Sequence, residues 1–289
     1  MKRYLNRVIC CAMALALCLG ITACGNSASG LTPDEVMEKA QKSMDSITSM
    51  SYDMTINMEM SVDGESIIMN SDAVADCILD PMQMKIDMTM DMGEIGSLAT
   101  TEYVVGENGQ NMMYIGMDLG AGQMIWAKQE FPDLSSLEQY DAKATMNMYI
   151  DSAESFTQNG TESINGVHTT RYDGVIKGDA IEQVIDASGI MEQYAALGLD
   201  DETMNLIQGE LGNLPISIWV ADDSYVPMKY EMDMTDMMQV MMTKMSESMD
   251  EENPDITIDA VLISMTMKNI NGVSEIVLPE EALNAEIIG

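Results

Sequence analysis

The side chains that could do chemistry in this 289-residue chain are few, apart from methionine and the acids. There is a single histidine, His168, which lies just after the predicted turn Ile164-Asn165-Gly166. No nucleophile elbow, HExxH, glycine-rich phosphate loop or CxxC motif occurs in the sequence. Carboxylates are abundant, but no spacing singles out a pair for general acid–base work. We therefore predict that the protein is not an enzyme and carries no cofactor.

Methionine is the most unusual component, with 33 residues against only 2 phenylalanines. Met-x-Met spacing occurs at Met58/Met60, Met82/Met84, Met88/Met90/Met92 and Met232/Met234. Thioether sulfur is a soft ligand that suits Cu(I), so copper binding is one interpretation. The same spacing is what one face of a strand requires, and the methionines of residues 237–249 follow helical spacing instead. Because methionine changes period with the predicted element, a core or a cavity lining is the favoured interpretation, and we predict no metal site.

The N-terminus has the parts of a secretory signal. Residues 1–7 are basic without an acid, and the apolar run of residues 8–19 is shorter than the roughly 20 residues of a permanent membrane helix. The sequence Ile21-Thr22-Ala23-Cys24 resembles the bacterial lipobox, which implies diacylglycerol on the Cys24 thiol and cleavage before it. A plain cleaved signal with an incidental cysteine is the alternative. We predict a lipoprotein signal peptide over 1–23 and a lipidated cysteine with a flexible tether over 24–31, holding the protein on the cell membrane outside the cytoplasm.

Cleavage would change the cysteine count and the charge. Cys10, Cys11 and Cys18 would leave, Cys24 would carry lipid, and Cys77 would have no partner for a disulfide. Three of the 13 basic residues lie in the signal, so 10 remain against 48 acids, a net charge of −38. This charge repels nucleic acids and anionic lipid surfaces, so we predict no nucleic-acid partner. The acidic runs 200–202 and 250–252 lack EF-hand spacing, and we interpret them as solvated. We expect a monomer.

The first half of the remaining chain predicts one helix and then a series of strands. Thr32-Pro33-Asp34-Glu35 is typical of a helix start, and the helix should end near Ser49. From Tyr52 the hydrophobic period becomes two, with a hairpin turn at Asp63-Gly64 and the cleanest alternation over 82–92. Further strands are predicted at about 99–106, 111–117 and 123–128.

The second half predicts mixed helices and strands. We expect a helix with an irregular stretch over 133–150, strands near 154–158 and 167–177, a helical region over 179–209, strands at 214–221 and 225–234, a helix at 235–249, a long strand to about 268 and a short strand to Leu278. Strands that are apolar on one side only need a cover for that side. The chain therefore predicts one α+β domain over 32–289, an open antiparallel β-sheet packed on helices.

Several short segments of this half carry a family resemblance. They are the strand–turn–strand Phe156–Tyr172 with its Asn165-Gly166, the strand Trp219-Val220-Ala221-Asp222, the segment Val226-Pro227-Met228-Lys229 and the ending Ile276-Val277-Leu278-Pro279-Glu280. Together they resemble the LolA/LppX-like lipoprotein superfamily over residues 32–282. The resemblance implies a strongly curved half-barrel that wraps around helices. It also implies that a cavity between the sheet and the helices binds acyl chains or other hydrophobic molecules.

These observations lead to a binding function as the first hypothesis. We predict a non-enzymatic lipoprotein that binds a lipid or another hydrophobic molecule, as a carrier or a sensor. The candidate lining residues are Met54, Met58, Met60, Met82, Met84, Met88, Met90, Met92, Trp126 and Trp219. A structural or protein-interaction lipoprotein with a closed core, in which methionine replaces leucine, is the alternative, and Cu(I) binding is a third hypothesis.

Overall fold

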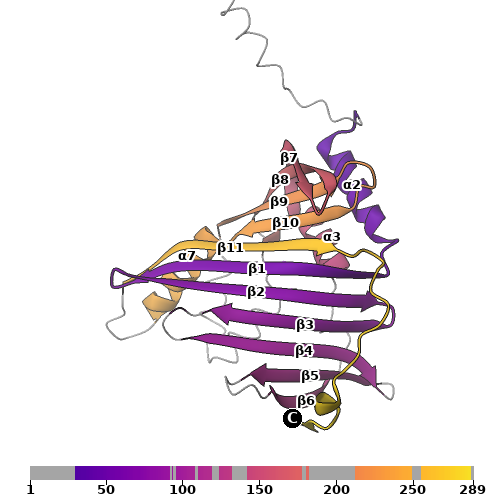
Figure 1. The fold of residues 1–289 in the computed structure, drawn as a ribbon. Coiled ribbons are helices and arrows are strands. Elements are labelled where there is room, and N and C mark those ends of the chain that lie inside the picture. Colours follow the sequence, from indigo (N-terminus) through magenta and orange to yellow (C-terminus); the bar gives the residue numbers. More distant parts are fainter. Residues whose placement is uncertain are drawn as a thin grey trace, which may run out of the picture.

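The described strands of the chain form one large open sheet. The computed structural model describes residues 30–91, 93, 96–107, 110–118, 124–131, 142–177, 180–181, 212–248 and 255–287. Its 12-stranded sheet has the order β12-β6-β5-β4-β3-β2-β1-β11-β10-β9-β8-β7 (Figure 1). The edge strands β12 and β7 do not pair with each other, so the sheet is an open half-barrel, as predicted. The predicted signal peptide and Cys24 lie outside the described residues.

The strands follow the chain in two blocks that meet at the centre of the sheet. The first block is β1 (Ser49–Val62), β2 (Glu65–Leu79), β3 (Met82–Asp91), β4 (Ser97–Glu107), β5 (Gln110–Asp118) and β6 (Met124–Phe131). The second is β7 (Ala153–Ile164), β8 (Val167–Lys177), β9 (Asn213–Ala221), β10 (Pro227–Asp233) and β11 (Ile256–Lys268), which pairs with β1. The turns at Asp63-Gly64 and Asn165-Gly166 have positive φ at both residues, as a two-residue hairpin requires.

Four helices lie among the described residues: α2 (Pro33–Met44), α3 (Ala142–Ser152), α7 (Thr235–Ser248) and the short α8 (Glu280–Leu283). The predicted start of α2 is confirmed. The Thr32 hydroxyl accepts a bond from the Glu35 backbone N–H, and the Glu35 carboxylate accepts one from the Thr32 N–H at 2.7 Å. Such a cap stabilises a helix by about 1 kcal/mol.

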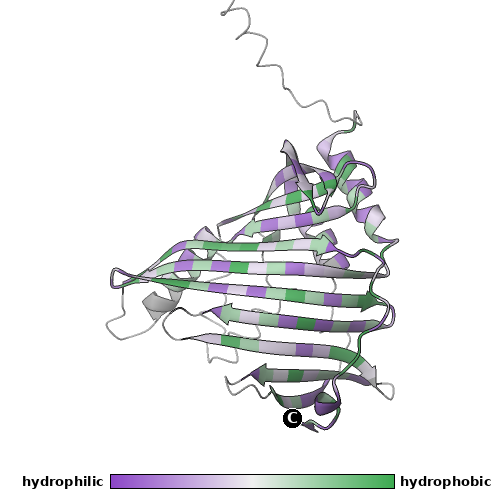
Figure 2. Ribbon diagram, in the orientation of Figure 1, coloured by the Kyte–Doolittle hydropathy of each residue, from purple (hydrophilic) through white to green (hydrophobic). Residues whose placement is uncertain are grey.

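The sheet has an inner face, against which α2, α3 and α7 pack, and an outer face. The main core consists of side chains from these helices and from the inner positions of β1, β2 and β7–β11. Tyr149 of α3 packs edge-on against Tyr230 of β10, with 5.5 Å between ring centroids. Burial raises the pKa of Tyr149 to about 12, so this pair stays neutral. Figure 2 shows the alternation along β1–β4 that separates the two faces.

Several sequence predictions need correction. The first helix ends at Met44 rather than near Ser49, because Ser49 already pairs with Ile78 in β1 and β2. Strand β7 is longer than predicted, since its register shifts let it follow β8 to the Asn165-Gly166 turn. Residues 273–279 form no strand, and the sheet is not wholly antiparallel, because β12 (Glu286–Ile287) pairs parallel with β6. The predicted helical region lies outside the described residues, except for residues 180–181.

Candidate functional site

Backbone pairing aligns inner-face side chains into continuous rows across the first block of strands. One row runs through Met54, Ala73, Met88, Thr100, Met117 and Ile125, from β1 to β6. The next row runs through Tyr52, Ala75, Ile86, Glu102, Ile115 and Ala127, and a third through Met50, Cys77, Met84, Val104, Met113 and Gln129. The methionines that the sequence places on one side of each strand are therefore neighbours on one surface.

This surface has two parts that differ in what covers them. On β1, the side chains of Met54, Met58 and Met60 are half-buried and pack against the main core beside the helices. On β3–β5, the cluster of Met84, Val104 and Met113 is buried. The described helix that contacts β5 is α8, which packs on the outer face rather than on this one. Further along the same face, Met88 and Met90 are half-buried, while Met117 is 40% and Ile125 54% exposed. We call the inner positions of β3–β6 the methionine face.

The predicted lining methionines are thus brought together, with one exception. Met82 is half-buried and touches the main core and the cluster around Met84. Met84 is 1% exposed and accepts a bond from the Tyr52 hydroxyl at 3.6 Å. Met92 lies outside the described residues.

Trp126 lies on the outer face, which corrects the prediction that it lines the same surface as the methionines. Trp126 follows Ile125 directly in β6, so its side chain points to the opposite face of the sheet, where its ring lies over Gly116. There it packs with Tyr103, at 6.0 Å between ring centroids, and with the C-terminal residues Ile276 and Leu278. The C-terminal segment covers this end of the outer face, which is why an apolar ring is stable there.

Trp219 also lies on the outer face, at the other end of the sheet. Its strand partners are Arg171 of β8 and Lys229 of β10, and both cations stack on its ring, at 5.1 and 4.5 Å from the centroid. These contacts leave the indole 3% exposed. The prediction that Trp219 lines the methionine surface is therefore wrong, because the ring is buried between two cations on the opposite side of the sheet.

One carboxylate interrupts the methionine face. Glu102 of β4 lies between Ile86 of β3 and Ile115 of β5, and burial raises the pKa of its carboxyl above the usual 4.5. Two residues away, the hydroxyl oxygen of Thr100 is buried without a hydrogen-bond partner. Thr100 lies between Met88 and Met117 in the adjacent row. Sequence analysis did not predict this pair, because threonine and glutamate at alternate positions of a strand are typical of a solvated face.

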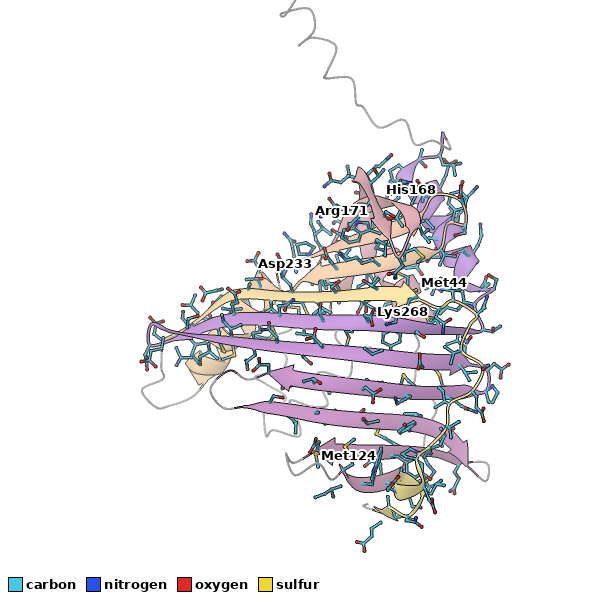
Figure 3. The ribbon with its side chains drawn as sticks, in the orientation of Figure 1. Met44, Met124, His168, Arg171, Asp233 and Lys268 are labelled. Atoms are coloured by element: carbon cyan, nitrogen blue, oxygen red, sulfur yellow. The ribbon has the colours of Figure 1, made fainter. Side chains whose placement is uncertain are left out.

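The residues considered for metal binding or catalysis do not assemble into a site in the described part of the chain. No group of three or more His, Cys, Asp or Glu side chains converges there. Cys77 is buried in the core, with its thiol 3.8 Å from the Met82 sulfur. His168 is exposed at the start of β8, on the second block of strands, whereas Met124 marks the β6 edge at the far end of the sheet (Figure 3).

No helix within the described ranges is long and apolar enough to cross a membrane. Among curated proteins, none matches this sequence.

Solved structures of the predicted group are similar to this chain. The lipoprotein LppX from Mycobacterium tuberculosis is 14% identical, with a TM-score of 0.44, and the match covers 84% of this chain and 97% of LppX. LprF from Mycobacterium bovis is 15% identical, with a TM-score of 0.46, and the match covers 86% of this chain and 97% of LprF. A LolA superfamily protein from Nitrosomonas europaea is 11% identical, with a TM-score of 0.23, and the match covers 87% and 96% of the two chains. These proteins belong to the predicted LolA/LppX group, and likeness at this level transfers neither a ligand nor an activity.

The family model that matches covers nearly the whole described domain. It spans residues 32–286, from the capping threonine of α2 to β12. This chain belongs to the family of unknown function DUF6612.

Proposed function

We propose that this protein is a non-enzymatic, membrane-anchored lipoprotein that binds a lipid or another hydrophobic molecule on its methionine face. In this proposal Cys24 carries the lipid anchor, residues 25–31 are the tether, and the domain works outside the cytoplasm as a carrier or a sensor. The resemblance to lipoproteins of the LolA/LppX group supports the location.

The observation that carries the proposal is that β3 is polar on its outer side, whereas the methionine face on the inner side becomes more exposed toward β6. The outer positions of β3 are polar, with Lys85 bonded to Asp87. The inner positions of β3 are methionine and isoleucine, and the exposure of the apolar side chains on the methionine face rises from 1% at Met84 to 54% at Ile125. An apolar surface that extends from buried to exposed is typical of an interaction site. Methionine, being flexible and polarizable, suits acyl chains of varied shape.

A protein-interaction lipoprotein with a closed core is the second candidate. It is favoured by the near-complete burial of Met84, Val104 and Met113, which shows that part of this face is core. Cu(I) binding is the third hypothesis. It has less support, because the methionine spacing is already explained by one face of the strands.

The experiment is to produce the full chain in a bacterium that processes lipoproteins, purify it, and analyse its organic extract by mass spectrometry. We expect a co-purified hydrophobic compound at close to one molecule per protein. The variant Met88→Gln should retain markedly less, because its amide would lie in the row that the ligand covers.

The matched control is Thr89→Gln, which changes the next residue of β3 on the exposed outer side. It should retain as much compound as the wild type. Recovery of no compound from wild type, together with no binding of a fluorescent fatty acid, would favour the closed core.

A further inference from the structure

Glu102 and Thr100 are out of place on the surface that they occupy. Within the described residues, Glu102 is the only charged side chain at the inner positions of β3–β6. Lys85, Asp87 and Lys128, on the same strands, lie on the outer face. No hydrogen bond or ion pair of the Glu102 carboxylate is present among the described residues. The Thr100 hydroxyl beside it is buried and unpaired. Both side chains come from inner positions of the same strand, so they face the same space.

Folding alone does not account for this pair. A desolvated carboxylate without a partner and an unpaired buried hydroxyl each destabilise the folded state, whereas leucine or valine at either position would continue the surrounding surface. Unsatisfied buried polar groups are rare in native proteins, and those that persist need an explanation such as a missing ion, water or ligand. Here both groups lie on the surface for which we propose a hydrophobic ligand.

We propose that Glu102 and Thr100 bind the polar head of an amphiphile whose head group carries hydrogen-bond donors and a positive charge, with a primary amine as the simplest case. The carboxylate would accept bonds from the ammonium group, and the Thr100 hydroxyl would accept a further one. The chain would then lie over Met88, Met117 and Ile125, which share the row of Thr100 and become more exposed toward β6. This inference rests on the proposed binding function.

Charge decides the class of head group. An anionic head on this face would meet Glu102 and no described cation, so it would be repelled without compensation. The net charge of −35 on the full chain acts in the same direction, since it raises the local concentration of cations and lowers that of anions. A neutral alcohol could bond to both groups, but it would leave the carboxylate charge unpaired.

The test compares three probes that share a 16-carbon chain: hexadecylamine, hexadecanol and hexadecanoate. The full chain is purified in a non-ionic detergent and titrated with each probe at pH 7, and occupancy is measured by native mass spectrometry. The variants are Glu102→Gln, Thr100→Val and, as a matched control, Glu59→Gln, which changes an exposed carboxylate on the outer face of β1. We expect wild type to bind the amine about tenfold more tightly than hexadecanoate, since a charge-assisted bond contributes at least a tenfold factor.

The variants separate the head-group site from the binding function. Glu102→Gln should weaken hexadecylamine binding about tenfold and change the affinity for hexadecanol by no more than about twofold. Thr100→Val should weaken hexadecylamine binding severalfold. Glu59→Gln should change the affinity for neither probe. If wild type binds all three probes equally, or if Glu102→Gln keeps the amine preference, the head-group site is wrong while hydrophobic binding stands. If none of the probes binds wild type, the proposed function itself fails.

Discussion

At the scale of single residues, Glu102 links stability to function. Burial raises the pKa of its carboxyl, so the folded state holds the proton more tightly than the unfolded state does. The folded protein therefore loses stability as the pH rises from the unfolded value of about 4.5 through the folded pKa, and this loss is complete at pH values above both. A residue that destabilises the ligand-free protein near neutral pH is consistent with a binding role.

The corresponding prediction concerns Glu102→Gln. At pH 7 we expect the variant to have a higher melting temperature than wild type, because it removes the desolvated charge. The difference should shrink as the pH approaches 4.5, where both states of wild type begin to be protonated. Differential scanning fluorimetry over pH 4–8 measures this, and Glu59→Gln is the control for a general loss of negative charge. A Glu102→Gln variant that melts lower than wild type at pH 7 would contradict the prediction.

Lipidation of Cys24 stays a prediction from the sequence. If its thiol carries lipid, Cys24→Ser should prevent lipid attachment and cleavage, so the variant should incorporate no radiolabelled fatty acid. Wild type should incorporate the label and enter the detergent phase of a Triton X-114 partition. Cys77→Ser is the control, because Cys77 is a buried core thiol. Equal labelling of wild type and Cys24→Ser would show that the lipobox resemblance is incidental.

At the scale of elements, the C-terminal segment fixes one end of the sheet. Figure 1 shows it running from the end of β11 past the ends of β1–β5 to α8 beside β6. Its start is held by Asn271, whose side-chain oxygen accepts a bond from the Thr48 N–H at 2.7 Å. Its end buries Ala282 against Tyr103 and Tyr114 on the outer face. This segment gives β4–β6 apolar contacts on both sides, which explains why Trp126 is found opposite the methionines.

The close approach of Trp126 to Gly116 gives a test of this packing. A Cβ atom at Gly116 would lie 2.9 Å from three atoms of the Trp126 ring. We expect Gly116→Ala to displace the ring and to lower the free energy of unfolding by about 1–3 kcal/mol, as overpacking does. Urea unfolding and the tryptophan emission maximum measure the two effects. Gly106→Ala is the control, because no atom lies within 4 Å of its Cβ position. Equal stability of the two variants would contradict this account.

At the scale of the whole molecule, the acidic charge dominates the electrostatics. The full chain carries −35, and the exposed ion pairs, such as Lys42–Glu38 at 3.7 Å, each contribute about 1 kcal/mol or less. Repulsion among the acidic side chains should therefore destabilise the fold by more than the ion pairs stabilise it. We expect the melting temperature to rise with NaCl between about 10 mM and 500 mM, since the screening length falls from about 30 Å to a few ångströms over this range. A melting temperature that falls with salt would show that the ion pairs dominate.

The sequence alone determined the local features of the fold. Alternation predicted β1–β3, Asp63-Gly64 and Asn165-Gly166 predicted their turns, and Thr32 with Glu35 predicted the start of α2. Each of these depends on interactions between residues a few positions apart, which the order of the chain displays directly. The fold class followed, because one-sided strands in succession need a cover for their apolar face.

Only the tertiary structure decided which side chains share a surface. The register between strands sets whether Glu102 faces Ile86 and Ile115 or faces solvent, and a shift by one residue would reverse its face. Trp126 and Trp219 were misplaced for the same reason, since their strands are apolar on both sides and alternation cannot tell which side is inner. That choice depends on the C-terminal segment and on the cations of neighbouring strands, which are distant along the chain.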